Sequence, residues 1–243
     1  MLESWDALTA RAAPNVFMHP AALSAVDEKK FARVHVLRAF REAEGGRELV
    51  GFWALRERRI APLWPRFLAA PPYEYAFVAS PVIDPAHRDA VMAAFLDAIA
   101  HAPSLPKVIR LTLLDGEAAA PLMAALGARG GHALKLSEHA RPYLGGEADR
   151  KRSGSTAKKL RQDFNRLSAL GAVEVVNDRE SVRAAFETFL EMELRSWKGA
   201  NGTALMSHDE DAEFARAMIG NLSEAGGASV ALLRVDKDRK SVV

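Results

Sequence analysis

Cysteine is absent from the 243-residue sequence, and its absence excludes several kinds of chemistry. A chain without thiols has no disulfide framework, no thiolate nucleophile and no zinc–thiolate site. Long apolar runs are also missing: none approaches the length of a membrane span, and the N-terminal residues lack the basic start and apolar stretch of a secretion signal. We therefore expect a cytoplasmic protein without a membrane partner.

Charge of one sign is scarce as well. The formal net charge is only +2, whereas nucleic-acid-binding proteins usually carry a stronger bias or one concentrated basic face. Residues 150–166 form the one basic stretch, so we do not expect a nucleic-acid partner. The histidines show no pair at metal-ligand spacing, and the sequence has no G-x-S-x-G motif, Walker loop or Rossmann fingerprint. No metal site is expected.

The remaining composition is that of an ordinary globular protein, with 49% hydrophobic and 26% charged residues. Alternating, β-branched residues predict a strand at 34–41, which a Gly45-Gly46 turn connects to a returning strand at 49–55. A proline-rich loop at 61–72 follows. The other predicted elements of this first half are helices at 5–11, 20–31 and 117–126, a helix that begins at Asp84-Pro85, and strands at 73–79, 108–114 and 132–137.

The second half repeats the order helix, helix, strand. It has a basic helix at 155–170, a short strand at 173–176, a long helix from Asp178 to Trp197, a loop at 198–206, a helix that Ser207 and Glu210 cap, and a strand at 229–235. We therefore predict an α/β (α+β) protein in which helices flank mixed β-sheets. Two similar sub-folds follow one another along the chain.

The strand at 229–235 reaches a turn at Asp236-Lys237-Asp238, and no partner strand is evident after it. We expect the second sub-fold to be incomplete, with an open strand edge that promotes association. Residues 238–243 read Asp-Arg-Lys-Ser-Val-Val, which matches the translation of a common sequencing adapter, GAT CGG AAG AGC GTC GTG; the alternative is a natural polar tail. The expected organisation is a first domain at 1–140, the start of a second at 141–237, and an adapter-derived tail at 238–243.

Glu193 is the most informative single residue. It falls on the apolar stripe of the long predicted helix, three residues after Leu190 and four before Trp197. A carboxylate at this position faces the core or a cleft, where it can act as a general base. The alternative is a structural glutamate paired with an arginine from another element.

The segment after that helix, Lys198 to Thr203, contains Gly199 and Gly202, which permit close approach of a ligand to the backbone. The basic helix carries Arg161, which can hold an anionic substrate or an RNA phosphate, although a solvated face is the commoner meaning of such a pattern. Tyr75 can line a cleft or belong to the core.

The segment FLEMELRSWKGANGTAL, at 189–205, resembles a signature of the bacterial BioF2-like acetyltransferases. These are CelD-type proteins of the GNAT superfamily, linked to cellulose or other exopolysaccharide production. The basic segment SGSTAKKLRQDFNRLSALG, at 153–171, and the turn PNVFMHP, at 14–20, resemble the same family. The resemblance extends up to Lys237.

This resemblance implies two tandem GNAT folds, similar to those of Fem-type transferases, and acyl transfer from acetyl-CoA or another acyl-CoA to a small-molecule, sugar or amine acceptor. GNAT folds hold the CoA pyrophosphate on backbone N–H groups of a glycine-rich turn. The matching turn in the first half, Ser80–Pro85, has no glycine, two prolines and Asp84. We expect this half not to bind CoA, the CoA-binding residues to lie beyond Val243, and the 243-residue chain to be inactive.

Within the resemblance, Glu193 is expected to accept the acceptor's proton, directly or through water. Other residues are expected to bind the substrate: Trp197, Lys198, Gly202, Thr203, Tyr75 and Arg161. Two alternatives remain open. One is a Fem-like transferase that uses aminoacyl-tRNA, with the basic helix on the RNA; the other is a non-catalytic partner protein of a polysaccharide operon.

Overall fold

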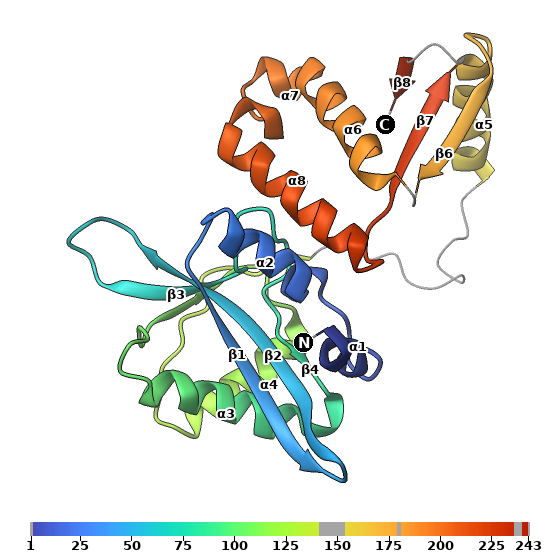
Figure 1. The fold of residues 1–243 in the computed structure, drawn as a ribbon. Helices are drawn as coiled ribbons and strands as arrows, with labels where there is room; N and C mark the ends of the chain where they lie inside the picture. Colours follow the sequence, from blue (N-terminus) through green and yellow to red (C-terminus); the bar gives the residue numbers. More distant parts are fainter. Residues whose placement is uncertain (1, 141–153, 179–180, 236–239, 243) are drawn as a thin grey trace. The chain divides into compact units, whose positions relative to one another are not determined.

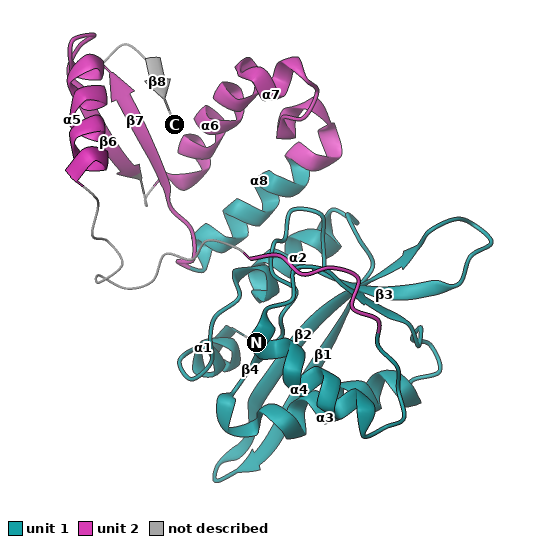
Figure 2. Ribbon diagram, turned by 180° about the vertical axis from the view of Figure 1, so that it is seen from behind, with its two compact units in different colours: residues 1–133, 213–225 teal, residues 134–212, 226–243 magenta. Residues whose placement is uncertain are grey.

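The computed structural model describes residues 2–140, 154–178, 181–235 and 240–242. It shows an α/β protein whose chain divides into two compact units (Figure 2). Unit 1 contains residues 1–133 and 213–225, and unit 2 contains residues 134–212 and 226–243. No helix in the described ranges is long and apolar enough to cross a bilayer. The boundaries at 140 and 237 stay predictions.

Unit 1 is built on a mixed five-stranded sheet (Figure 1). Its strands are β1 (Val34–Ala43), β2 (Gly46–Arg59), β3 (Arg66–Ala70), β4 (Val82–Ile83) and β5 (Ile109–Leu111). The order is β1-β2-β3-β5, with β4 also paired to β2; β3 and β5 run parallel and the other pairs antiparallel. The predicted glycine turn between β1 and β2 is confirmed, because Gly45 and Gly46 both have positive φ.

The helices of this first unit are α1 (Leu2–Thr9), α2 (Pro20–Glu28), α3 (Arg88–His101) and α4 (Gly116–Gly127), with 3₁₀ turns η1 (Val16–Met18) and η2 (Pro85–His87). Trp53, Phe52 and Leu55 of β2 are fully buried in the core. Gly51 lets α3 approach β2, since a Cβ there would lie 2.3 Å from the Val91 side chain.

Two strands predicted in the first half are wrong. Residues 73–79 form no ladder, because side chains hold this segment instead: Trp53 Nε1 donates to the carbonyl of Ala79 and Asn15 Nδ2 to that of Ser80. Residues 132–137 are irregular too, and Leu134 is exposed rather than turned toward a core. The strand β3 lies instead inside the predicted proline-rich loop, just before Pro71.

Unit 2 contains α5 (Gly154–Ser168), β6 (Val173–Asp178), α6 (Val182–Arg195), α7 (Trp197–Ala200), the 3₁₀ turn η4 (Leu205–Ser207), β7 (Val230–Val235) and β8 (Lys240–Val242). Its sheet has the order β6-β7-β8, with both pairs antiparallel. The two units share α8 (Asp209–Glu224), of which residues 209–212 belong to unit 2 and the rest to unit 1.

The expectation that the strand at 229–235 lacks a partner is wrong. β7 is the central strand: Val235 pairs with Val173 of β6, and Leu233 pairs with Val242 of β8. The first pairing was not predicted because three helices, α6, α7 and α8, separate β6 from β7 along the chain. The second pairing uses residues of the segment that we expect to be an adapter-derived tail, and the origin of that segment stays a prediction.

Candidate active site

Glu193 lies on the buried side of α6, as the sequence predicts. The apolar face of the helix is buried and consists of Val182, Phe186 and Leu190. The Glu193 side chain is only 7% exposed. A carboxylate in this position must be satisfied by nearby donors, because burial removes its contact with water.

Two donors from the segment that follows α6 satisfy the Glu193 carboxylate. Its Oε1 accepts a hydrogen bond from Lys198 Nζ at 2.7 Å, and its Oε2 accepts one from the backbone N–H of Leu205 at 2.8 Å. The carboxylate therefore ties α6 to α7 and to η4. The alternative of an arginine partner from another element is wrong, since the ion pair is local.

Ser196 ends α6 and starts α7. Its hydroxyl donates to the carbonyl of Glu193 at 2.7 Å and accepts from the N–H of Lys198 at 3.2 Å, which is the geometry of an N-cap. The predicted helix to Trp197 is therefore too long. The predicted start at Asp178 is also wrong, because Asp178 ends β6 and Ser181 precedes the first turn of α6.

Local backbone geometry explains why both positions 199 and 202, in the segment after α6, are glycine. A Cβ on Gly199 would lie 1.8 Å from the carbonyl oxygen of Leu194, so only glycine lets α7 fold back onto the end of α6. Gly202 has a φ of +68°, a conformation that glycine adopts without strain. Thr203 closes the turn, since its N–H and its hydroxyl both donate to the carbonyl of Lys198.

Of the predicted site residues, the structure brings Glu193, Lys198, Gly202 and Thr203 together in this segment, which we call the 193–205 turn. Trp197 belongs to it but points to the surface, where its indole is 69% exposed. Arg161 is exposed on α5, and Tyr75 belongs to unit 1, where it stacks on Phe31. Neither is a side-chain partner of Glu193.

Ser196 and the Leu205 N–H were not predicted as parts of this site. A serine directly before a short apolar helix was a usable N-cap signal for Ser196. No side-chain pattern predicts a backbone donor such as the N–H of Leu205.

Chemically, the turn exposes part of the Lys198 ammonium and the Trp197 indole, and the buried Glu193 carboxylate holds the ammonium in place. In the described part of the chain, no three His, Asp or Glu side chains are grouped as a metal site.

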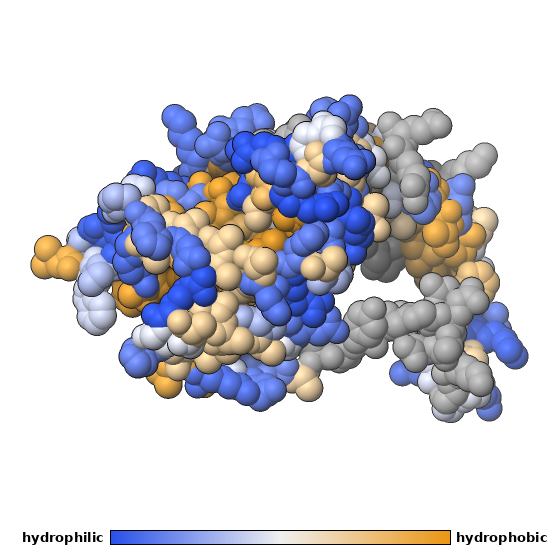
Figure 3. All heavy atoms as spheres, turned by 90° about the horizontal axis from the view of Figure 1, so that it is seen from below, coloured by the Kyte–Doolittle hydropathy of each residue, from blue (hydrophilic) through white to orange (hydrophobic). Residues whose placement is uncertain are grey.

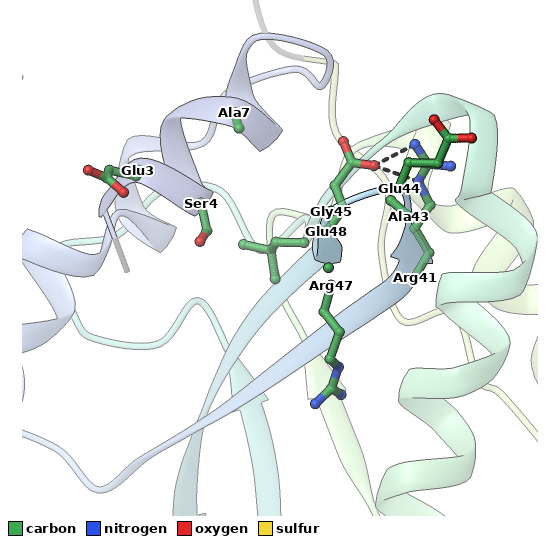
Figure 4. Close-up of a pocket in the computed structure, with 11 residues that line it drawn as sticks. Glu3, Ser4, Ala7, Arg41, Ala43, Glu44, Gly45, Arg47 and Glu48 are labelled. Carbon is green, nitrogen blue, oxygen red and sulfur yellow. Dashed lines mark hydrogen bonds and ion pairs between the residues drawn. The ribbon is translucent and has the colours of Figure 1, made fainter.

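Unit 1 has a surface hollow of about 710 Å³ between α1 and the β1–β2 turn (Figure 4). Within it Glu48 lies against Arg41 (Figure 4), and Glu48 also pairs with Arg11 at 2.9 Å. None of the predicted site residues lines this hollow. The hollow is open and has no feature that selects a ligand.

The turn at Ser80–Pro85 does not fit a CoA pyrophosphate. Asp84 Oδ1 accepts from the N–H of Ala86, and its Oδ2 accepts from Arg11 Nε at 2.8 Å. The hydrogen bond from Arg11 lowers the pKa of Asp84, so the carboxylate is charged at neutral pH. A negative group of the protein thus occupies the helix start that a pyrophosphate would need.

The comparisons with known proteins concern the C-terminal part of the chain. The family model described as the acetyltransferase (GNAT) domain matches residues 154–242, from the start of α5 into β8, and includes the whole 193–205 turn. No curated protein and no solved structure matches the chain significantly. The C-terminal part of the chain is therefore similar to GNAT acetyltransferase domains, which suggests that the protein is an enzyme.

Proposed function

We propose that the protein is a GNAT-type acyltransferase that moves an acyl group from an acyl-CoA to an amine or hydroxyl acceptor. The match of residues 154–242 to the GNAT acetyltransferase domain carries this proposal. An acyl-CoA would supply the acyl group as an activated thioester. The acceptor nitrogen or oxygen would then form the new bond to the carbonyl carbon while the carbon–sulfur bond breaks. The electrons of that bond leave with sulfur, and the proton that the acceptor loses ends on the CoA thiol.

Within this proposal, the 193–205 turn helps to bind the acceptor. The geometry supports a positioning role for Glu193 more than the general-base role, because each of its oxygens already accepts a hydrogen bond from the turn. Lys198 and Trp197 are among the groups of the turn that reach solvent. In this arrangement Glu193 acts through Lys198, whose ammonium it orients, while Gly202 and Thr203 fix the path of the backbone.

The finer features of the resemblance are proposals as well: tandem GNAT folds, a role in exopolysaccharide or cellulose production, and a unit 1 that does not bind CoA. The last is supported by the Asp84–Arg11 pair at the Ser80–Pro85 turn.

A Fem-like transferase that uses aminoacyl-tRNA is the second candidate. The exposed basic residues of α5, Lys158, Lys159 and Arg161, favour it, because they could contact RNA phosphates.

The experiment is an acyl-transfer assay on the 243-residue chain, which also tests the expectation that this chain is inactive. Acetyl-CoA is offered with a panel of amines and alcohols, and the released CoA is followed with a thiol reagent. Because the chain has no cysteine, the protein adds no background signal. Acceptor-dependent CoA release supports the proposal. Failure with every acyl-CoA, together with salt-sensitive tRNA binding, would favour the second candidate.

The role of Glu193 is separated from that of a general base by the E193Q variant, with E191Q as the matched control. Glu191 lies on the same helix, and its side chain is 61% exposed. A positioning role raises KM with little change in kcat, whereas loss of a general base lowers kcat about 10²–10⁴-fold and the loss shrinks at high pH. Unchanged kinetics in a folded E193Q variant would exclude both roles.

A further inference from the structure

The hairpin between β2 and β3 extends beyond the body of unit 1. The two strands pair from Arg56 opposite Ala69 to Arg59 opposite Arg66, and residues 60–65 form the tip. Figures 1 and 2, drawn from opposite sides, both show this hairpin reaching outward from the sheet. We call residues 58–66 the β2–β3 finger.

Three large apolar side chains occupy the tip of the finger, and each is mostly exposed. Leu63 is 98% exposed, Ile60 67% and Trp64 58%. Seen from below, an apolar group projects at the end of the molecule where the finger lies (Figure 3). Exposed leucines are common singly, but three large apolar residues gathered on one projecting tip are a feature of interaction sites.

The tip is held in one shape before it meets any partner. The Trp64 N–H donates to the carbonyl of Ala61 at 2.9 Å, and Arg59 Nη1 donates to the carbonyl of Pro62 at 2.5 Å. Pro62 and Pro65 further restrict the backbone. A preformed tip loses little conformational entropy on binding, so its apolar side chains are presented at low cost.

Positive charge surrounds the base of the tip. Residues 56–66 contain four arginines and one glutamate. Arg58 pairs with Glu74 and Arg66 with Glu57, whereas Arg59 forms no ion pair with a carboxylate of the described residues. The finger therefore combines an apolar end with a collar of net positive charge.

We propose that the β2–β3 finger binds an anionic lipid surface, with Leu63, Trp64 and Ile60 entering the interface and the arginine collar meeting the headgroups. A convex apolar tip suits a fluid, deformable surface, which needs no complementary pocket. Indole rings partition to the bilayer–water boundary, and arginines just behind it are attracted by anionic headgroups. Interfacial binding of this kind requires no membrane-spanning helix. It departs from the expectation of no membrane partner, which rested on the lack of long apolar runs.

The test is sedimentation of the full 243-residue chain with vesicles, one set containing phosphatidylglycerol and phosphatidylcholine in equal parts and the other phosphatidylcholine alone. We expect binding to the anionic vesicles that weakens as salt is raised. The L63S/W64S variant should bind at least about tenfold more weakly, because two interfacial side chains are lost. The R59Q variant should lose less vesicle binding, because it removes a single positive charge.

The L134S and F164S variants are the matched controls. Leu134 and Phe164 are exposed apolar residues elsewhere, the first in unit 2 and the second on the basic helix α5. Both variants should bind as the parent does. Equal binding by L63S/W64S and the parent overturns the proposal, and so does loss of binding in F164S alone, since α5 would then be the lipid-binding element. Absence of binding to anionic vesicles overturns it as well.

Tryptophan emission gives a second, local readout. Trp5 and Trp53 are buried, whereas Trp64 and Trp197 are exposed. In a W197F background, Trp64 is then the exposed tryptophan, and its emission should shift to the blue on anionic vesicles and be quenched by lipids brominated near the headgroup. An unshifted spectrum with bound protein would show that the tip stays in water and would contradict the insertion.

Discussion

Glu193 accepts hydrogen bonds from two donors that belong to different elements, Lys198 of α7 and Leu205 of η4. The Leu205 N–H depends on it most, because a backbone donor that loses a buried partner keeps its desolvation cost. We expect Glu193→Ala to lower the free energy of unfolding by about 1–3 kcal/mol, as measured by urea denaturation. Glu191→Ala, on the exposed side of the same helix, should stay within about 0.5 kcal/mol. Equal effects would contradict this assignment.

Tyr73 gives the chain a pH dependence in the alkaline range. Burial raises the pKa of Tyr73 above its ordinary value near 10. Above about pH 10 the unfolded chain loses the phenolic proton while the folded chain keeps it, so stability is complete below that pH and falls as the pH rises. The slope contributed is at most about 1.4 kcal/mol per pH unit. Urea titrations between about pH 9 and 11 should show a shallower decline for Tyr73→Phe; identical declines would argue against burial.

The sequence could predict that Glu193 is buried, because the stripe of Val182, Phe186 and Leu190 fixes which side of the helix it occupies. It could not predict the partners. The Leu205 donor is a backbone group, and its position depends on the break at Ser196, which shortens α6. The same break removes Trp197 from the apolar stripe of the predicted helix and leaves it exposed.

At the scale of elements, the return of α7 onto the end of α6 depends on one glycine. The ideal Cβ of an alanine at 199 would overlap the Leu194 carbonyl, and a backbone atom cannot rotate away as a side chain can. We expect Gly199→Ala to destabilise unit 2 by more than about 1 kcal/mol, as measured by thermal or urea unfolding. Gly154→Ala, which meets no atom within 4 Å, should be neutral or slightly stabilising. A neutral Gly199→Ala would mean that α7 packs differently.

The strand β7 carries the second prediction at this scale. Its outer ladder is occupied by β8, from Leu233 opposite Val242 to Val235 opposite Lys240. Removing residues 238–243 would leave β7 with unpaired N–H and C=O groups along one side. We expect the truncated chain to associate more than the 243-residue chain, as seen by light scattering, with faster amide exchange at Leu233 and Val235. Equal behaviour of the two chains would show that β8 does not protect β7.

Periodicity identified most of the helices and the β1–β2 hairpin, because their apolar spacing agrees with local geometry. It failed where long-range hydrogen bonds decide. Residues 73–79 resemble a strand through the buried Tyr73 and Ala79, yet the Ala79 carbonyl is taken by the Trp53 side chain. The sequence of the short, proline-flanked β3 is typical of a loop, and only its pairing with β2 and β5 makes it a strand.

At the scale of the whole molecule, α8 contributes residues to both units, and the sequence does not reveal this division. Read along the chain, the helix belongs to the second half. Its Phe214 is nevertheless fully buried in unit 1, stacked on Phe31 with ring centroids 4.3 Å apart and edge-on to Tyr73 at 5.3 Å. Tyr75 stacks on the same ring at 6.4 Å. A core contact between Phe31 and Phe214, about 180 positions apart, cannot be recognised from local sequence patterns.

This contact predicts how residues 1–140 behave alone. Without residues 213–225 the aromatic site around Phe31 and Tyr73 would open to water, so the truncated chain should unfold at a lower temperature than unit 1 in the full chain. A synthetic peptide of residues 209–225 should raise that temperature when added in excess, because a ligand of the folded state stabilises it. The same peptide with Phe214→Ala should not, since loss of a buried phenylalanine costs about 3–5 kcal/mol. A chain of residues 1–140 that is unaffected by either peptide would show that this domain is complete without α8.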